Sequence, residues 1–456
     1  MAWLIISTKI PLGGVLAVAL LVQSETADAG GFAVREQSVS GLGAAYAGVA
    51  AGYDLSSMFW NPAGASIAHT PQGEGHNSYI IPSGEMSGSA FFEPLTGGSV
   101  PLPTLDSSSG LYTKQALVPA MYLAMPVNEQ LSLGLAVNSP FGLTTEPEKP
   151  NWAGKFEART SELRTYNFNP ILSYKLTDQL ALAAGLQIQY IEATLKSAFP
   201  GIGGLPGLNP STTIKDADDL DAGYTLGLLW QSGIGTDIGI GFRSSIEHEL
   251  EGDLRVVGTP ALGAAGVSAD LETPEIVTAS LRQQLGERTT LLGTVEWTNW
   301  SRLDLVQIRS RTLNPVLGAK TFGGIVTELP LNWDDGWFYA AGIEYEANER
   351  MTLRTGFAYE ESPIQSATQR TPRSPDTNRF WASIGATYQL NESTSFDFAY
   401  SHVFFEDGTI DRTSPIGDLG QVRFLGDVQQ NVDIVALSIK VKLGSESPEI
   451  SPSSNY

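Results

Sequence analysis

The chain lacks cysteine, and its other shortages narrow the classes of protein that fit it. Zero cysteines exclude a disulfide scaffold and thiol chemistry. With 27 basic against 49 acidic residues, the sequence does not suit a nucleic-acid partner, because phosphate binding needs clustered Lys and Arg. Past Val22, no apolar run approaches the ~20 residues of a membrane-spanning helix. A water-soluble protein and a membrane β-barrel, whose strands hide their hydrophobicity by alternation, both remain compatible with this composition.

Histidine is also scarce, with 4 residues in the chain. His69 and His76 form the closest pair, and no further ligands cluster with them, so the sequence predicts no metal site. A barrel phospholipase would need a serine nucleophile beside a histidine, and neither His248 nor His402 accompanies a serine motif. The Asp-rich run 216–221 lacks the glycine and the distal glutamate of a calcium loop. We therefore expect no enzyme activity, no metal and no cofactor.

The first residues predict export. One positive charge in residues 1–9 precedes the apolar run 10–22, and residues 27–29 place alanines at the two positions that a signal peptidase reads. The run is short for a bilayer span, which takes roughly 20 residues. We expect a signal peptide cleaved between Ala29 and Gly30.

Alternation with period two is the strongest pattern in the rest of the chain. In residues 179–190 the even positions are apolar and the odd positions are polar or small. Residues 221–231, 337–347, 379–390 and 432–443 alternate in the same way. These predicted strands run about 10 to 14 residues, longer than the 5 to 6 typical of soluble sheets. Aromatic residues gather at strand ends on the apolar face, as in the girdles of membrane barrels: Tyr174, Tyr190, Trp230, Tyr345, Tyr388 and Tyr400.

The connections between these strands alternate in length. Very short turns are predicted at 128–129, 177–178, 232–233, 286–287, 348–349 and 391–392. Between them lie long Gly-, Pro- and Ser-containing segments, which we expect to be loops: 91–110, 141–161, 197–218, 250–272, 310–334, 361–377 and 407–429. A soluble β-sandwich has no reason to sort its connections by length, whereas outer-membrane barrels place short turns in the periplasm and long loops outside the cell. The pattern predicts an antiparallel outer-membrane β-barrel of about 14 strands.

Several stretches resemble the FadL/TodX family of outer-membrane transporters for long-chain fatty acids and other hydrophobic compounds. The most specific are GFAVREQSVSGLGAAYAG (31–48) and FWNPAG (59–64). Later stretches that resemble the family are VPAMYLAMPV (118–127), LGLAVNSPFGL (133–143), EWTNWS (296–301), LNWDDGW (331–337), LRTGFAY (353–359) and SPDTNRFW (374–381). The resemblance runs from about Gly31 to Leu443 and implies a fourteen-stranded barrel plugged by a small N-terminal helical hatch.

We divide the chain accordingly into signal peptide (1–29), hatch or plug (30–70), transmembrane barrel (71–443) and a polar C-terminal tail (444–456). The small residues of the plug suit a barrel of limited bore. Its hatch or gate residues are predicted to be Phe59, Trp60, Asn61, Pro62, Ala63 and Gly64. The last strand ends in KVKL rather than on a terminal aromatic residue. We expect a monomer that contacts outer-membrane lipid, lipopolysaccharide and the barrel assembly machinery.

The family resemblance also implies a route: capture at extracellular loops, a hydrophobic lumenal site, and lateral exit where the third strand kinks. Pro140 has no N–H for the sheet and Gly142 tolerates unusual dihedrals, so pairing should fail at this point, unless the strand simply ends there. The predicted exit comprises Asn138, Ser139, Pro140, Phe141 and Gly142. Predicted capture residues, which alternatively only cap the barrel, are Phe199, Ile202, Leu205, Leu208, Val257 and Leu262. Candidate partners for a ligand carboxylate, each of which could instead pair with a lumenal acid, are Arg243, Arg354, Arg379 and Lys440.

The predicted function is uptake of long-chain fatty acids or related amphiphiles by loop capture, lumenal binding and lateral release. An alternative is uptake of aromatic or alkane hydrocarbons by the same route, which a lumen without a carboxylate-binding cation would favour. A general aqueous porin is the third hypothesis.

Overall fold

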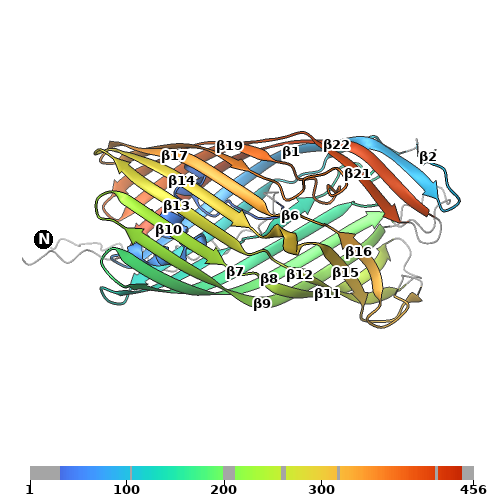
Figure 1. Ribbon diagram of the computed structural model, residues 1–456, viewed down its shortest axis with the longest axis horizontal. Helices are drawn as coiled ribbons and strands as arrows, with labels where there is room; N and C mark the ends of the chain where they lie inside the picture. Colours follow the sequence, from blue (N-terminus) through green and yellow to red (C-terminus); the bar gives the residue numbers. More distant parts are fainter. Residues whose placement is uncertain are drawn as a thin grey trace, which may run out of the picture.

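The computed structural model describes residues 31–102, 105–198, 211–257, 263–315, 319–415 and 420–443. The chain forms a closed antiparallel β-barrel of 14 wall strands, which confirms the predicted fold class (Figure 1). β1 (Gln72–Pro94) pairs along its whole length with β22 (Gly420–Lys442) and so joins the two ends of the sheet. Closure leaves no sheet edge at membrane depth, where lipid cannot satisfy backbone hydrogen bonds.

The wall is a continuous ring of pairings in the half that carries the short turns. The ring runs β1-β4-β5-β7-β8-β9-β10-β13-β14-β17-β18-β19-β20-β22 and returns to β1. The remaining bounds are α2 (Val39–Gly43), η1 (Val49–Ala51), η2 (Leu55–Phe59), η3 (Pro62–Ile67), β2 (Val100–Pro101), β3 (Ser108–Leu111), β4 (Ala116–Pro126), β5 (Leu131–Asn138), β6 (Gly142–Thr145), β7 (Thr160–Lys175), β8 (Leu180–Ala198), β9 (Ser211–Gln231), β10 (Thr236–Arg243), β11 (Glu247–Val257), β12 (Ala264–Glu272), β13 (Ile276–Leu285), β14 (Thr289–Thr298), η6 (Trp300–Arg302), β15 (Leu305–Ser310), β16 (Ile325–Pro330), β17 (Gly336–Asn348), β18 (Met351–Glu360), β19 (Arg379–Asn391), β20 (Thr394–Phe405) and β21 (Gly408–Pro415).

Side chains alternate between the two faces of the wall, as the sequence predicts. In β8, Leu182 and Leu186 are exposed on the outer face, whereas Gln187 and Gln189 are buried inside. A bilayer covers such outward leucines, so their exposure to solvent in the isolated chain is exposure to lipid in the membrane. The inward polar side chains meet the plug and one another instead.

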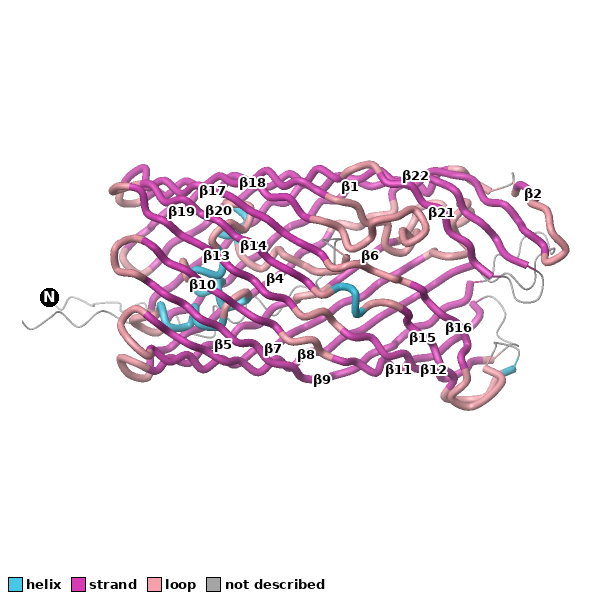
Figure 2. The backbone as a smooth tube through the Cα atoms, in the orientation of Figure 1, coloured by secondary structure: helices cyan, strands magenta, loops and turns pink. Residues whose placement is uncertain are grey.

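The plug lies inside the barrel, in the half that carries the short turns (Figure 2). Three of its four described helices begin at side-chain caps, because Ser38, Asp54 and Asn61 each accept a hydrogen bond from a backbone N–H two or three residues later, whereas η1 begins at Gly48 without one. Small residues bring it against the wall: a Cβ on Gly43 would lie 2.9 Å from the Cα of Gly385 in β19. The segment 39–66 can therefore pack closely against the wall, because glycine stands on both sides of this contact.

The half of the barrel with the long connections differs from the sequence prediction. Residues 250–272 and 407–429, expected to be loops, contain β11, β12, β21 and part of β22. In β11 the outward positions are the exposed Glu247, Glu249 and Glu251, while His248 and Leu250 are buried inside. Period two persists there, but acidic residues on the outer face conceal it from a search for apolar alternation. Strands β1 and β22 accordingly have 23 residues each, longer than expected.

The cleavage site at Ala29 and Gly30 and the tail 444–456 lie outside the described residues. Within the described part of the chain, no helix is long and apolar enough to cross a membrane. The described residues also contain no group of three or more His, Cys, Asp or Glu side chains arranged to hold a metal ion.

Candidate transport path

An apolar cavity of about 130 Å³ lies inside the barrel in the half with the long connections. The wall supplies most of its lining, from β6 to β9 and from β11, β12, β15 and β16, together with the segment 371–374. Leu163, Leu250 and Leu271 project into the same buried cluster as Trp333. The inward-facing residues of the strands above the plug therefore form a hydrophobic chamber rather than an aqueous channel.

Arg373 is the one basic side chain in the lining of this cavity as the described residues define it. Its Nη1 donates to Ser161 Oγ at 3.1 Å, and its buried Nε has no hydrogen-bond partner. Burial lowers the pKa of Arg373 to about 10, against an opposing effect of Glu157, so the guanidinium is charged at neutral pH. A partly desolvated cation with an unused donor beside an apolar chamber is suited to a ligand with an anionic head.

Two aromatic rings of the lining, Phe32 and Trp333, form the floor of the cavity, and Phe141 and Trp300 pack against Phe32. Phe32 packs edge-on against Phe141 and Trp300, with ring centroids 5.7 Å and 4.8 Å away, and Trp333 lies 5.6 Å away. All four residues are buried. A cavity of about 20 Å³ at the level of the plug is lined by Phe59, Trp60, Arg243 and Pro140. Because Phe32 and Val34 line the upper and lower cavities respectively, the N-terminal segment separates them.

The third wall strand is interrupted between β5 and β6, at residues 139–141, which we call the first break. β5 pairs with both β4 and β7, whereas β6 forms a ladder with β7 and, on its other side, a single bridge between Thr145 and Thr113. Among the described residues, no strand pairs with residues 116–120 of β4 on the side of this break. The predicted interruption is thus present in the wall; its role as an exit stays a prediction.

The N-terminal arm, residues 31–37, occupies the hydrogen-bonding positions that a neighbouring strand would take at the first break. Val34 N donates to Pro140 O at 2.8 Å, and Gly142 N donates to Phe32 O at 2.7 Å. The Gln37 side chain donates to Ser139 O at 2.8 Å. The arm therefore connects the cavity floor directly to the break, so that a displacement of Phe32 pulls on the same segment that seals the wall.

Ion pairs anchor the arm and the plug to the wall. Arg35 donates to Glu296 at 2.7 Å and to Glu360 at 3.2 Å, and its guanidinium lies 3.8 Å from the ring centroid of Phe338. Lower down, Lys440 of β22 pairs with Asp54 of the plug at 2.5 Å. Charges from opposite sides of the plug-wall contact thus neutralise one another in a buried setting.

The four predicted carboxylate partners are all occupied by the barrel or the plug. Arg354 pairs with Glu344, Arg379 with Glu360 and Asp376, and Lys440 with Asp54 and Asp397. Arg243 bonds to Gln187 and to the backbone oxygen of Phe59. None of the four lines the cavity, as far as the described residues define it.

The predicted hatch residues lie in η2, η3 and the turn between them. Asn61 has an extended backbone, because the ring of Pro62 disfavours the helical region for the residue before it, and its side chain donates to Leu228 O of β9 at 2.9 Å. Gly64 does not turn the chain with a positive φ; instead, a Cβ there would lie 2.1 Å from Ser57 Oγ. Its smallness lets η2 and η3 pack together. The rings of Phe59 and Trp60 pack edge to face with their centroids 4.8 Å apart, and the Arg243 guanidinium lies over the Phe59 ring.

Of the predicted capture residues, Val257 is described and is 60% exposed at the end of β11. Phe199, Ile202, Leu205, Leu208 and Leu262 lie outside the described residues. Loop capture therefore remains a prediction.

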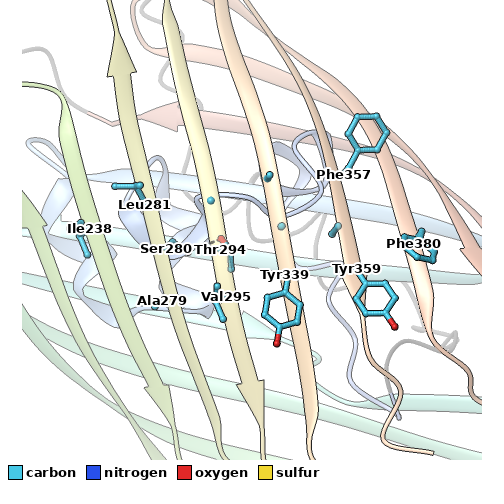
Figure 3. A pocket seen from close by; sticks show the side chains of 14 residues that line it. Ile238, Ala279, Ser280, Leu281, Thr294, Val295, Tyr339, Phe357, Tyr359 and Phe380 are labelled. Atoms are coloured by element: carbon cyan, nitrogen blue, oxygen red, sulfur yellow. Dashed lines mark hydrogen bonds between the residues drawn. The ribbon is translucent and has the colours of Figure 1, made fainter. Parts of the chain in front are cut away.

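A second hollow, of about 700 Å³, lies on the outer face of the wall (Figure 3). Leu281, Val295, Tyr339, Phe357 and Phe380 are exposed around it. They project from five strands into the space that the bilayer occupies. This hollow is part of the lipid-facing surface and is separated from the cavity by the wall.

The sequence matches the family described as outer membrane protein transport protein (OMPP1/FadL/TodX) over residues 20–443. The chain belongs to this family. Outer membrane protein P1 of Haemophilus influenzae is 27% identical over 88% of this chain and 92% of its own length. The long-chain fatty acid transport protein of Escherichia coli K12 is 25% identical over 85% of this chain and 91% of its own length. This member of the family is accordingly an outer-membrane transport protein.

Solved structures share the fold. A Pseudomonas aeruginosa FadL homologue superposes with a TM-score of 0.79, at 23% identity, over 91% of this chain and all of the other. The Pseudomonas putida toluene transporter TodX superposes with a TM-score of 0.63 at 15% identity, over 91% of this chain and 100% of the other. Both support the barrel of this FadL/TodX protein.

Sequence reasoning missed Arg373. The search for cations considered strand positions whose parity points inward, whereas Arg373 lies in the connection between β18 and β19 that folds into the lumen. The stretch SPDTNRFW, which resembles the family, begins at the next residue, and Arg373 itself lies just outside it.

Proposed function

We propose that this protein takes up long-chain fatty acids or similar amphiphiles, which enter the cavity and leave sideways through the first break into the outer membrane. The observation that carries the proposal is Arg373, the one cation that the described residues place in the lining of a mostly apolar chamber. The apolar lining takes the hydrocarbon chain out of water at about 0.8 kcal/mol for each CH₂ group, and the guanidinium takes the carboxylate.

The size of the cavity adds a mechanical step. At about 130 Å³ it is smaller than the ~300–1,000 Å³ of typical ligand pockets, so a long chain needs the floor to move. Phe32 is part of that floor and belongs to the arm that seals the first break. Ligand entry would therefore displace the arm and open the exit, which couples occupancy to release without an energy source.

The decisive experiment compares oleate with oleyl alcohol in an Arg373→Met variant. A lost charge-assisted hydrogen bond is worth about 1.5–3 kcal/mol, so oleate affinity should fall roughly 10- to 100-fold while binding of the alcohol is unchanged. Arg373→Lys should recover part of the oleate affinity. Equal affinity of wild type and Arg373→Met for oleate would remove Arg373 from the binding site.

Hydrocarbon uptake is the second candidate, because most of the lining is apolar, although Glu162 and Arg373 also belong to it. A deletion strain complemented with this gene that takes up toluene in preference to oleate would establish hydrocarbon uptake. The plug disfavours an aqueous porin, because it buries the inward side chains of the half with the short turns. Rapid entry of sugars into liposomes that contain the protein would contradict a plugged barrel. We propose further that the protein catalyses no reaction. Contacts with lipopolysaccharide and the assembly machinery stay predictions.

A further inference from the structure

The wall has a second discontinuity, between β12 and β15, on the far side of the cavity from the first. These two strands pair only through Val267–Ala269 and Ile308–Ser310. Below that, pairing resumes where Ile276 of β13 meets Thr298 of β14. Residues 270–275 thus face residues 299–307, and the longer side accommodates its extra length in the turn η6 (Figure 2). We call this region the second break.

The interruption between β10 and β11 is bridged more closely than this one. At 244–246 the Ser244 N–H donates to Tyr224 O at 2.9 Å, and Tyr224 N donates back to Ser244 Oγ at 2.9 Å. Across the second break, the described residues provide one backbone hydrogen bond, from Asn299 N to Glu275 O, at its lower corner. Between that corner and the pair formed by Ala269 and Ile308, the two edges share no ladder.

Both edges of the second break line the cavity. Leu271 on one edge and Val306 on the other belong to its lining, and Leu303 packs into the same apolar cluster. A separation of these two edges would therefore open the cavity itself and not a solvent-filled pocket of the wall.

On the outside, two side chains span the second break: Asn299 Nδ2 donates to Glu275 at 3.0 Å at its lower corner, and Arg302 reaches across above it. Arg302 donates to Glu272 at 2.5 Å and binds Glu275 through two further donors. The Arg302 and Glu272 side chains are 35% and 33% exposed. The Arg302–Glu272 pair is weak, because water screens it and the long side chains lose entropy when fixed. Glu275 is 16% exposed and accepts from two Arg302 donors, so it is the firmer half of the bridge. An incoming carboxylate would therefore replace Glu272 first.

The second break lies just above a group of outward aromatic side chains. Trp297 precedes η6 in β14, and Trp337 stacks on Tyr339 with ring centroids 6.1 Å apart on the next wall strand. Aromatic belts mark the level where lipid headgroups begin. Arg302 therefore stands where an amphiphile dissolved in the outer leaflet would carry its carboxylate.

We propose that the second break is a lateral entrance through which an anionic amphiphile passes from the outer leaflet into the cavity, and that Arg302 is its latch. The arriving carboxylate replaces Glu272 and Glu275 on the guanidinium, which frees the two edges, and the hydrocarbon chain enters between Leu271 and Val306. The entrance deepens the proposed function, since it rests on the cavity being the ligand site, and it adds a route that does not start at the extracellular loops.

The absence of cysteine in the chain makes a direct test practical, because Leu271→Cys introduces the sole thiol, inside the cavity. The full-length protein is placed in lipid vesicles and reacted with N-dodecylmaleimide dissolved in the bilayer, and in parallel with a water-soluble maleimide. We expect Arg302→Met, and independently Glu272→Gln with Glu275→Gln, to raise the rate with the bilayer reagent several-fold and to leave the water-soluble rate unchanged.

Arg311→Met is the matched control. Arg311 pairs with Glu251 at 2.6 Å on the same outer surface, but beside strands that are paired through their backbones. Its loss should leave both labelling rates unchanged. Unaltered bilayer labelling in both latch variants would overturn the entrance, and so would an equal rise with both reagents, which would mean general loosening of the wall.

Oleate binding to the same vesicles separates the two proposals. Oleate binding that is indifferent to Arg373→Met refutes the ligand site, while latch-dependent labelling still stands. Oleate binding that needs Arg373, with labelling indifferent to the latch, refutes the entrance alone.

Discussion

The half of the barrel that carries the short turns and the half that carries the long connections are built differently. In the first, all wall strands pair in an unbroken ring, and the lumen is filled by the plug through buried ion pairs such as Lys440 with Asp54. In the second, two breaks interrupt the wall and the lumen holds an apolar cavity with one cation. The half with the short turns is sealed by its plug. The half with the long connections holds an apolar cavity between two breaks in the wall, through which we propose that a hydrophobic solute passes.

The largest effect should follow from breaking the charge balance of the sealed half. Lys440→Met leaves Asp54 and Asp397 facing each other in a buried site without their cation. Removing one partner of a buried ion pair costs about 3–5 kcal/mol, so amide exchange of the plug should accelerate strongly while oleate affinity stays the same. Adding Asp54→Asn should restore part of the protection. A large loss of oleate affinity with an intact plug would make Lys440 a ligand residue after all.

The plug should also loosen as the pH rises. Burial, together with the charge of Glu360, raises the pKa of Glu36 from 4.5 to about 7, against the opposing effects of a backbone hydrogen bond, Arg35 and Arg379. A raised folded-state pKa means that the stabilisation is complete below pH 4.5 and is lost as the pH rises through 7. Its size is about 3 kcal/mol at most, from 1.36 kcal/mol per pKa unit.

Protection factors of arm and plug amides between pH 5 and 8 measure this effect. In Glu36→Gln the side chain cannot ionise, so the protection should stay at its low-pH level throughout. A variant that keeps the wild-type pH dependence would assign the effect to another group.

The smallest effect is expected at the first break, where the arm already fills the pairing positions. Pro140→Val with Gly142→Val should favour strand pairing with β4 over pairing with the arm, and so slow oleate uptake several-fold in a correctly inserted barrel. Gln37→Leu should act in the opposite sense, because it removes the side-chain bond to Ser139 O and frees the arm. Unchanged uptake in both variants would place the exit elsewhere.

Period-two patterning was enough to predict the ring of wall strands, since a lipid-facing strand must be apolar at every second residue. It failed above the membrane, where Glu247, Glu249 and Glu251 face water and the same alternation reads as polar loop. The first break was predicted because Pro140 lacks an N–H, a local property. The second break was not predicted, although Pro274 within residues 270–275 lacks an N–H just as Pro140 does; the loss of pairing shows only once residues 299–307 are placed opposite this segment.

The sequence alone was therefore enough to predict the barrel, the small-residue plug, the interruption at Pro140 and a signal peptide, because each depends on the chemistry of neighbouring residues. Tertiary structure decided which charges are free. Arg243, Arg354, Arg379 and Lys440 carry the right chemistry for a carboxylate, but the fold brings Gln187, Glu344, Glu360 and Asp54 to them from distant segments. Arg373 lines the cavity because the connection that carries it folds into the lumen beside apolar strands, and no local pattern encodes that meeting.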